Sequence, residues 1–123
     1  DCINGALALG LWGLGTARAQ AAAPVILVVG DSMSAEYGLK RGSGWVALLE
    51  QRLAKEKIAV TVVNASVSGD TTSGGRSRLP ALLARHRPAV VIIELGGNDA
   101  LRGLPLTMTQ DNLTAMVRAA KAA

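Results

Sequence analysis

The sequence predicts an α/β fold in which helices cover both faces of an open, parallel β-sheet. Three short runs dominated by Val, Ile and Leu, at residues 25–29, 58–63 and 89–95, are typical of strands that are buried on both faces. A segment with apolar residues at helical spacing follows each run. Because strands and helices alternate, we expect parallel strands joined by right-handed crossovers in a three-layer α/β/α arrangement. In the flavodoxin-like order common to such sheets, the strands lie in the order 2-1-3.

The connecting segments are predicted from their spacing and composition. Residues 66–75 form a Gly- and Ser-rich turn, and the helix after it carries Pro80 near its start or at a kink. A last helix is expected from about Thr109. The helix between the first two strands is indicated by apolar residues at helical spacing, namely Trp45, Leu48, Leu49 and Leu53.

Composition indicates a small globular protein and excludes several functions. The 123 residues allow one small domain, and 18% charged residues with abundant Val, Ile and Leu argue against disorder. A single Cys excludes an internal disulfide and a structural zinc site. The net charge of +4 is scattered and aromatic residues are scarce, so nucleic-acid binding has no support. Because the chain begins at Asp1 and ends within a helical pattern, we expect it to be the amino-terminal part of a longer domain.

The amino-terminal segment resembles a secretory signal. Residues 5–15 are an apolar run that matches the central region of a signal peptide, and Ala17-x-Ala19 and Ala19-x-Ala21 fit the small-residue rule for cleavage. We therefore interpret residues 1–23 as a signal-peptide remnant and residues 24–123 as the mature domain, which would be periplasmic or secreted without a stable membrane anchor. The alternative is a buried first helix rich in Ala and Leu, although its four Gly residues would weaken it.

Small, polar loops follow each predicted strand. They are Gly30-Asp31-Ser32, residues 64–70, and Gly96-Gly97-Asn98-Asp99. The carboxyl ends of parallel strands meet at one edge of the sheet, where ligands bind in this class of fold. Each loop alone is weak evidence, because tight turns use the same residues for backbone reasons.

Together the loops offer the groups that acyl transfer requires. Ser32 supplies a hydroxyl nucleophile where a strand ends, Gly69 can present its backbone N–H without a Cβ in the way, and Asn98 can donate through its side-chain amide. Preorganised donors of this kind hold the oxyanion that develops on the attacked carbonyl. Such donors stabilise the negative charge that a metal ion would otherwise stabilise, so we expect neither a metal nor an organic cofactor.

Three sequence blocks carry a resemblance to a known family. The segments GDSMSAEYGL, NASVSGDTTSGG with RLPALL, and IELGGNDALRG resemble the first three blocks of the SGNH/GDSL hydrolases, in particular their bacterial periplasmic thioesterase, lysophospholipase and arylesterase branch. The resemblance covers about residues 24–123. It implies the SGNH hydrolase fold, cut after about three strands, with Ser32 as nucleophile and Ser32, Gly69 and Asn98 as the oxyanion hole. It also implies that Asp31 and Asp99 brace their loops.

The family completes its catalytic triad with a late Asp-x-x-His, which this sequence lacks. Its single histidine, His86, ends the predicted second helix and so lies near the amino ends of the strands. The distance to Ser32 should be on the order of 15–20 Å, far outside hydrogen-bond reach. We therefore expect the chain alone to be inactive or nearly so, because a serine without a positioned base is a poor nucleophile.

Two alternatives remain at this stage. A non-catalytic flavodoxin-like module could bind phosphate or another ligand in the same loops, although the usual phosphate-binding glycine motifs are missing. A carbohydrate acetylesterase would use the same three blocks.

The resemblance favours a small acyl ester or thioester, or a lysophospholipid, with a medium to long acyl chain. Segment 101–107 resembles the loop that lines the acyl pocket, and we expect a monomer.

Overall fold

The sheet has the predicted order and direction. The computed structural model describes residues 22–123. Its three strands are all parallel and lie in the order β2-β1-β3, with β1 pairing with both neighbours. The elements along the chain are β1 (Val25–Gly30), α2 (Trp45–Lys55), β2 (Thr61–Asn64), α3 (Thr72–His86), β3 (Val90–Glu94), α4 (Gly97–Leu101) and α5 (Leu106–Ala122).

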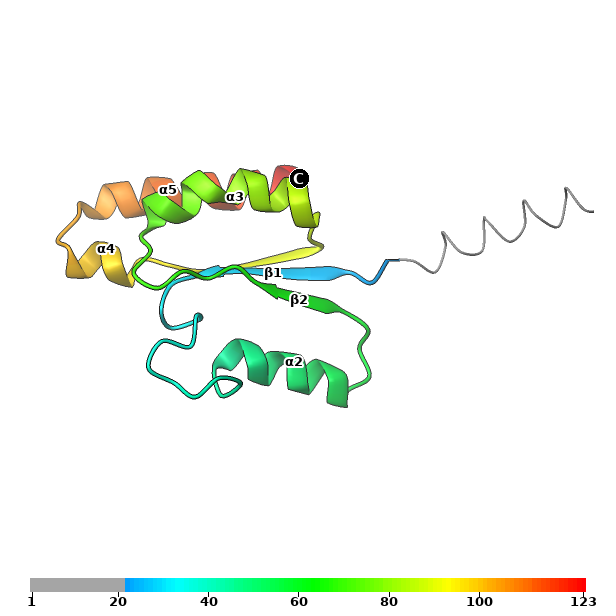
Figure 1. Ribbon diagram of the computed structural model, residues 1–123. Helices are drawn as coiled ribbons and strands as arrows, with labels where there is room; N and C mark the ends of the chain where they lie inside the picture. Colours follow the sequence, from blue (N-terminus) through cyan, green and yellow to red (C-terminus); the bar gives the residue numbers. More distant parts are fainter. Residues whose placement is uncertain (1–21) are drawn as a thin grey trace, which may run out of the picture.

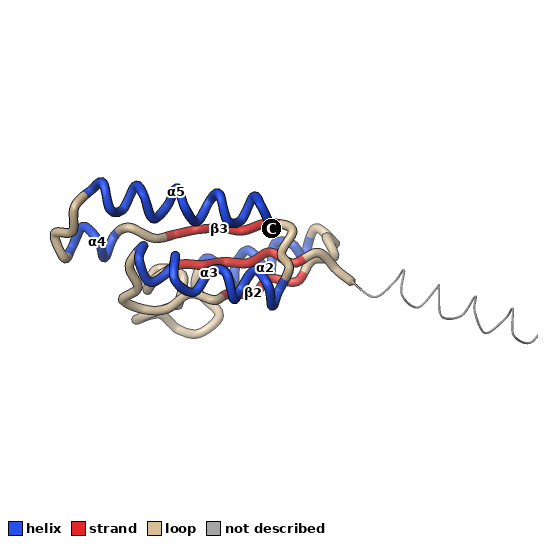
Figure 2. Tube along the Cα trace, turned by 90° about the horizontal axis from the view of Figure 1, so that it is seen from above, coloured by secondary structure: helices blue, strands red, loops and turns tan. Residues whose placement is uncertain are grey.

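Helices cover the sheet on both faces, as Figures 1 and 2 show: α3 and α5 lie on one side and α2 on the other. Because side chains alternate along a strand, Leu27 and Val29 of β1 point to the same face. There they form a buried cluster with Leu79 and Leu83 of α3 and Met116 of α5. The central strand is thus buried from both sides, which explains its continuous apolar sequence.

The second strand begins at Thr61, three residues later than predicted. Lys57 has a positive φ of 57°, its N–H donates to the carbonyl of Ala54, and the N–H of Ile58 donates to the carbonyl of Leu53. This is the Schellman pattern that ends a helix, in which an apolar residue after the cap contacts the last turn. The apolar Ile58 therefore belongs to the segment that caps α2, which ends at Lys55, and not to β2.

Two further boundaries differ from prediction. The helix α3 begins at Thr72, inside the predicted turn, because the hydroxyl of Thr71 caps it by accepting from the N–H of Gly74 at 3.3 Å. Pro80 consequently lies inside α3. The last helix begins at Leu106, directly after Pro105, and not at Thr109. The short helix α4 was not predicted, since its first residues, Gly97 to Asp99, have the composition of a turn.

The predicted signal peptide lies, except for residues 22 and 23, outside the described residues, so it stays a prediction. Pro24 directly precedes β1, where the sequence placed the start of the domain. Among residues 22–123, no helix combines the length and the apolar character that crossing a bilayer would require.

Candidate active site

The three predicted loops come together at the carboxyl ends of the strands. We call the surface formed by residues 31–44, 65–71 and 96–108 the strand-end face; it lies at the left in Figure 1. Backbone bonds continue the pairing of β1 and β2 into these loops: Ala65 donates to Val28 at 2.8 Å, and Val67 donates to Gly30 at 3.0 Å. The segment that carries Gly69 is thereby held beside the end of the strand that leads to Ser32.

Ser32 stands in a tight turn that Asp31 organises. The buried carboxylate of Asp31 accepts from the N–H of Met33 at 3.0 Å, and its carbonyl accepts from the N–H groups of Ser34 and Ala35. Ser32 itself is partly exposed, between a buried Asp31 and an exposed Met33. The turn therefore anchors its first residue in the protein and leaves the next side chain at the surface.

A partly buried polar cluster around Ser34 supports this turn. Ser34, only 1% exposed, donates through Oγ to Oε1 of Glu94 at 2.7 Å and accepts from Nε1 of Trp45 at 2.9 Å. The same Glu94 oxygen accepts from the N–H of Asp31 at 3.3 Å. A Cβ on Gly30 would stand 2.6 Å from Ser34 Oγ and 2.8 Å from Glu94 Oε1, so only glycine fits above the cluster.

The sequence analysis did not predict this cluster and assigned no role to Ser34. A signal was available in Glu94, a carboxylate at the end of a continuous apolar strand. A charge in such a position needs partners, since burying it unpaired is costly.

The Gly69 loop is held by two residues from the α4 region. Gly69 has a φ of +81°, a conformation that glycine adopts without strain. Its carbonyl accepts from Nη2 of Arg102 at 3.1 Å, and the next carbonyl, that of Asp70, accepts from Nδ2 of Asn98 at 2.8 Å. A side-chain amide has two N–H groups, so this bond leaves the second N–H of Asn98 uncommitted.

Arg78 on α3 joins the three segments from the other side. Its Nε pairs with Oδ2 of Asp70 at 2.8 Å, and its guanidinium also donates to the carbonyls of Ala65 and Gly30. One side chain thus fixes the ends of β1 and β2 relative to the loop of Gly69. The block RLPALL was recognised in the sequence, but no role was assigned to its arginine.

Asp99 connects three helices. It is 1% exposed, and its two carboxylate oxygens accept from the N–H of Thr72 at 2.8 Å, from its hydroxyl at 2.5 Å, and from the hydroxyl of Thr109 at 2.8 Å. Burial by itself raises the pKa of Asp99, but the hydrogen bonds from Thr72 and Thr109 outweigh it and hold the pKa below its usual value. The ionised carboxylate therefore ties α4 to the beginnings of α3 and α5.

His86 lies where the sequence predicted, at the last residue of α3. Figure 1 shows that α3 begins at the strand-end face and runs back toward the start of β3. His86, the last residue of α3, therefore lies at the opposite end of the sheet from Ser32. Within residues 22–123, no group of His, Cys, Asp and Glu side chains is arranged to hold a metal ion.

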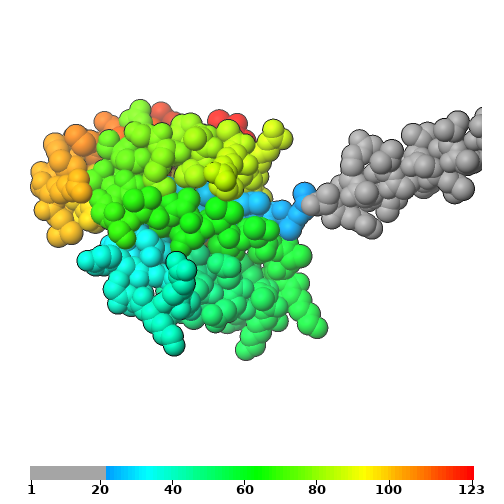
Figure 3. Space-filling view, in the orientation of Figure 1, coloured from blue at the N-terminus to red at the C-terminus, as the bar shows by residue number. Residues whose placement is uncertain are grey.

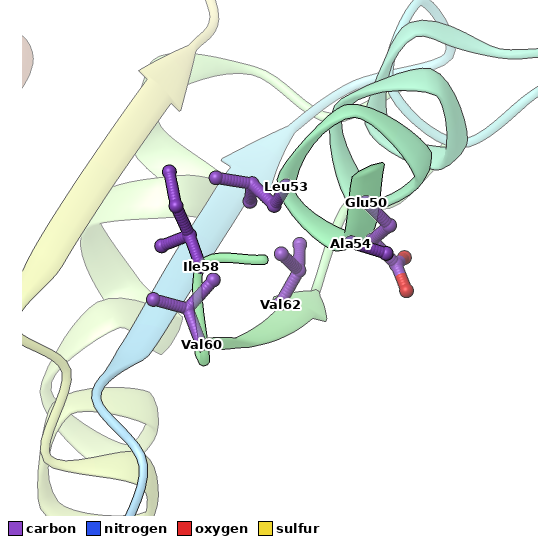
Figure 4. A pocket seen from close by; sticks show the side chains of 6 residues that line it. All are labelled: Glu50, Leu53, Ala54, Ile58, Val60 and Val62. Atoms are coloured by element: carbon purple, nitrogen blue, oxygen red, sulfur yellow. The ribbon is translucent and has the colours of Figure 1, made fainter. Parts of the chain in front are cut away.

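A cleft of about 230 Å³ also lies away from Ser32, between α2 and β2. Figure 4 shows its mostly apolar lining, which consists of Glu50, Leu53, Ala54, Ile58, Val60 and Val62. Of these, Leu53 and Ile58 belong to the Schellman contact that ends α2. The cleft is thus part of the packing between helix and strand.

Comparisons with known proteins agree with the geometry. The chain is 59% identical over 103 residues to "Esterase TesA" of Pseudomonas aeruginosa, covering 84% of this chain and 51% of that protein. It is 46% identical over 103 residues to "Thioesterase 1/protease 1/lysophospholipase L1" of Escherichia coli K12, covering 84% and 48%. A crystal structure of TesA superposes with a TM-score of 0.78 at 58% identity, covering 80% of this chain and 54% of that one.

The predicted fold class and family are both confirmed by these matches. The chain spans about half the length of the curated relatives it matches. Its residues 28–123, which include every element from the end of β1 onward, match the description "GDSL-like Lipase/Acylhydrolase family". The chain therefore belongs to the GDSL-like lipase/acylhydrolase family.

Proposed function

We propose that Ser32 is the nucleophile of a carboxylic ester or thioester hydrolase, with the N–H groups of Ser32 and Gly69 and the amide of Asn98 as oxyanion donors. The single observation that carries this proposal is the junction of the three loops at the strand-end face. There the turn of Ser32 and the Gly69 loop adjoin, and the 2.8 Å bond from Asn98 to Asp70 joins the third loop to the second.

In the proposed reaction, Ser32 Oγ attacks the substrate carbonyl and gives up its proton to a general base. The carbonyl oxygen becomes an oxyanion, which the three donors stabilise. Collapse of this intermediate breaks the bond to the alcohol or thiol, which leaves with a proton. Water then attacks the acyl-serine ester and releases the acid, restoring the Ser32 hydroxyl. His86 cannot serve as the base from the far end of the sheet.

The substrate is proposed to carry a medium to long acyl chain. Leu101 and Leu106, in segment 101–107, expose large apolar side chains on the strand-end face. The names of the relatives, which include a thioesterase and a lysophospholipase, favour the same class of substrate. Hydrolysis of acetylated sugars in preference to p-nitrophenyl octanoate would favour the acetylesterase alternative.

A chimera tests the role of Ser32. Residues 22–123 would replace the matching half of Pseudomonas aeruginosa TesA, to which the chain is 59% identical. We expect this chimera to hydrolyse p-nitrophenyl octanoate, and Ser32→Ala to lower kcat by at least about a thousandfold, because removal of a catalytic serine has effects of this size or larger. Asn98→Ala should lower it by about a hundred- to a thousandfold, the usual effect of losing one oxyanion donor.

Ser77→Ala is the matched control, since Ser77 is an exposed residue of α3. Full activity of the Ser32→Ala chimera would refute the proposal. The 123-residue chain itself should turn over no faster than its own Ser32→Ala variant, because it supplies no histidine at the strand-end face. Turnover by the chain that depends on Ser32 would show that it needs no further base.

A further inference from the structure

The loop of residues 36–44 joins the Ser32 turn to α2, and its tip carries an unusual set of side chains. Every residue from 37 to 42 is exposed. Tyr37 is 76% exposed and Leu39 is 55% exposed, and the next two residues are the cations Lys40 and Arg41. Exposed aromatic and aliphatic side chains next to two cations make this tip amphipathic over the five positions 37–41, with Gly38 between Tyr37 and Leu39.

The loop is held in shape at its base. The carboxylate of Glu36 accepts from the N–H groups of Gly42 and Gly44, both at 2.8 Å. Gly38 and Gly42 have φ values of +74° and +90°, which glycine permits. Because the one acidic side chain of the loop is used in this clamp, the charges that project into solvent are both positive.

The loop is also connected directly to the nucleophile. The N–H of Tyr37 donates to the carbonyl of Ser32 at 3.3 Å. Figure 3 shows the loop (cyan) at the surface, away from the end where the described chain begins (blue). Other large apolar side chains exposed on the strand-end face are those of Met33, Val67, Leu101, Leu106 and Met108.

We propose that the tip of this loop, residues 37–42, binds reversibly to a lipid surface that carries anionic headgroups. Lys40 and Arg41 would contact the headgroups, while Tyr37 and Leu39 enter the boundary between headgroups and acyl chains, where aromatic side chains with a polar end are favoured. The inference rests on the proposed function, because the lipid surface would present ester substrates to Ser32. The anionic class of lipid follows from charge: the exposed cations Lys40 and Arg41 outnumber the single carboxylate of the loop, that of Glu36, which two backbone N–H groups hold at its base.

The test uses the full chain and vesicles of phosphatidylcholine with or without 30% phosphatidylglycerol. We expect binding that needs phosphatidylglycerol. A cation near an anionic surface contributes about fivefold to binding, so Lys40→Gln with Arg41→Gln should weaken it by roughly twentyfold. Lys55→Gln with Lys57→Gln makes the same change of charge at the far end of α2 and should weaken it by less than about threefold.

The apolar contribution is tested separately. Tyr37→Ser with Leu39→Ser should weaken vesicle binding by roughly tenfold, whereas Ile58→Ser with Val117→Ser, at exposed apolar positions elsewhere, should leave it unchanged. All four double variants keep residues 1–21 intact, so any binding by that segment is common to them. Tyr37 is the single tyrosine, and a spin-labelled lipid should broaden its ring resonances.

Several results would overturn the inference. The first two are equal binding to vesicles with and without phosphatidylglycerol, and an equal loss of vesicle binding in the loop variants and the control variants. The other two are competition by polyglutamate that is as strong as competition by vesicles, and a loop variant that changes self-association but not vesicle binding. Ser32→Ala separates the two proposals, since it should bind vesicles like the unaltered chain. A chimera whose catalysis does not depend on Ser32, together with a chain that binds vesicles as expected, would refute only the proposed function. Catalysis that depends on Ser32, together with no vesicle binding by the loop, would refute only the lipid-binding loop.

Discussion

At the carboxyl ends of the strands, side chains that reach between loops add to the backbone bonds, whereas at the amino ends the sheet is held by backbone bonds. Arg78, Glu94 and Asp99 each connect two or more segments at the first end. At the second end, the N–H of Thr61 donates to Pro24 at 2.9 Å and that of Ala89 donates to Val25 at 2.8 Å. The same three strands therefore end in two different ways.

The difference teaches where the polar residues of the sequence are used. At the amino ends, backbone hydrogen bonds hold the residues that lead into β2 and β3 against the start of β1. The strand-end face has long loops whose shape a backbone ladder does not fix, and buried carboxylates and a guanidinium determine it. Charge-assisted bonds of this kind are stronger than neutral ones, and their loss leaves buried groups without partners. Substitutions of these side chains should consequently lower the free energy of unfolding more at the carboxyl ends of the strands than at the amino ends.

The largest effect on stability is expected at Asp99. Asp99→Asn keeps the size of the side chain but replaces one acceptor oxygen by a donor that would face the donors of Thr72 or Thr109. We expect the free energy of unfolding to fall by about 3 kcal/mol, as for a buried charged hydrogen-bonding group. Urea unfolding followed by circular dichroism measures this, with Asp111→Asn at an exposed position of α5 as control. Equal midpoints for the two variants would contradict the comparison.

Acid should have a matching effect through the same carboxylate. The pKa of Asp99 is lowered in the folded chain relative to 3.8, so its contribution to stability is fully present above that value. It is lost as the pH falls through the lowered pKa, because the unfolded chain then takes up the proton more readily. Unfolding measured from pH 6 down to pH 2.5 should show a smaller loss of stability in Asp99→Asn than in the unaltered chain. Parallel curves would assign the acid sensitivity to other groups.

Arg78 gives the next largest effect. Arg78→Gln removes the ion pair with Asp70 and the bonds to the carbonyls of Ala65 and Gly30, and we expect a loss of about 2 kcal/mol. The amide resonances of residues 65–71 should shift, because this loop loses its connection to α3. A change confined to α3 itself would show that the Gly69 loop keeps its position without the guanidinium.

Substitution of Ser34 should lower the free energy of unfolding by less than substitution of Arg78. Ser34→Ala leaves Trp45 Nε1 without its acceptor and removes one donor to Glu94, at an expected cost of about 1.5 kcal/mol. Fluorescence of Trp45 should report the change, and Ser77→Ala is the control on the exposed side of α3. If both variants unfold at the same urea concentration, the buried cluster does not stabilise the Ser32 turn.

The smallest effect is expected at the exposed ion pair of α2. Arg52 and Glu56 pair at 3.1 Å, four residues apart, with side chains that are 74% and 52% exposed. Arg52→Gln should cost less than about 0.5 kcal/mol, since solvent screens such pairs. Comparison of its urea midpoint with that of Arg78→Gln gives the sharpest test, because both remove one arginine from one ion pair. An equal loss of unfolding free energy in the two variants would contradict the difference between the carboxyl and amino ends of the strands.

The sequence by itself determined the architecture and the position of the candidate site. Continuous apolar runs of strand length alternate with helical spacing, and the alternation permits few topologies, so the order β2-β1-β3 could be predicted. The meeting of the loops of Ser32, Gly69 and Asn98 followed from parallel strands alone. The catalytic roles of these residues stay a prediction.

Only the tertiary structure decided how those loops are held. Ser34 and Glu94 are 60 residues apart in sequence, and Thr72 and Asp99 are 27 apart, so no local pattern links them. Their pairing depends on strand register and on the turn of each loop, which also set the start of α3 at Thr72 and the end of α2 before Ile58. Periodicity records which face of an element is buried, but the partners of a buried polar group are known only once the strands stand side by side.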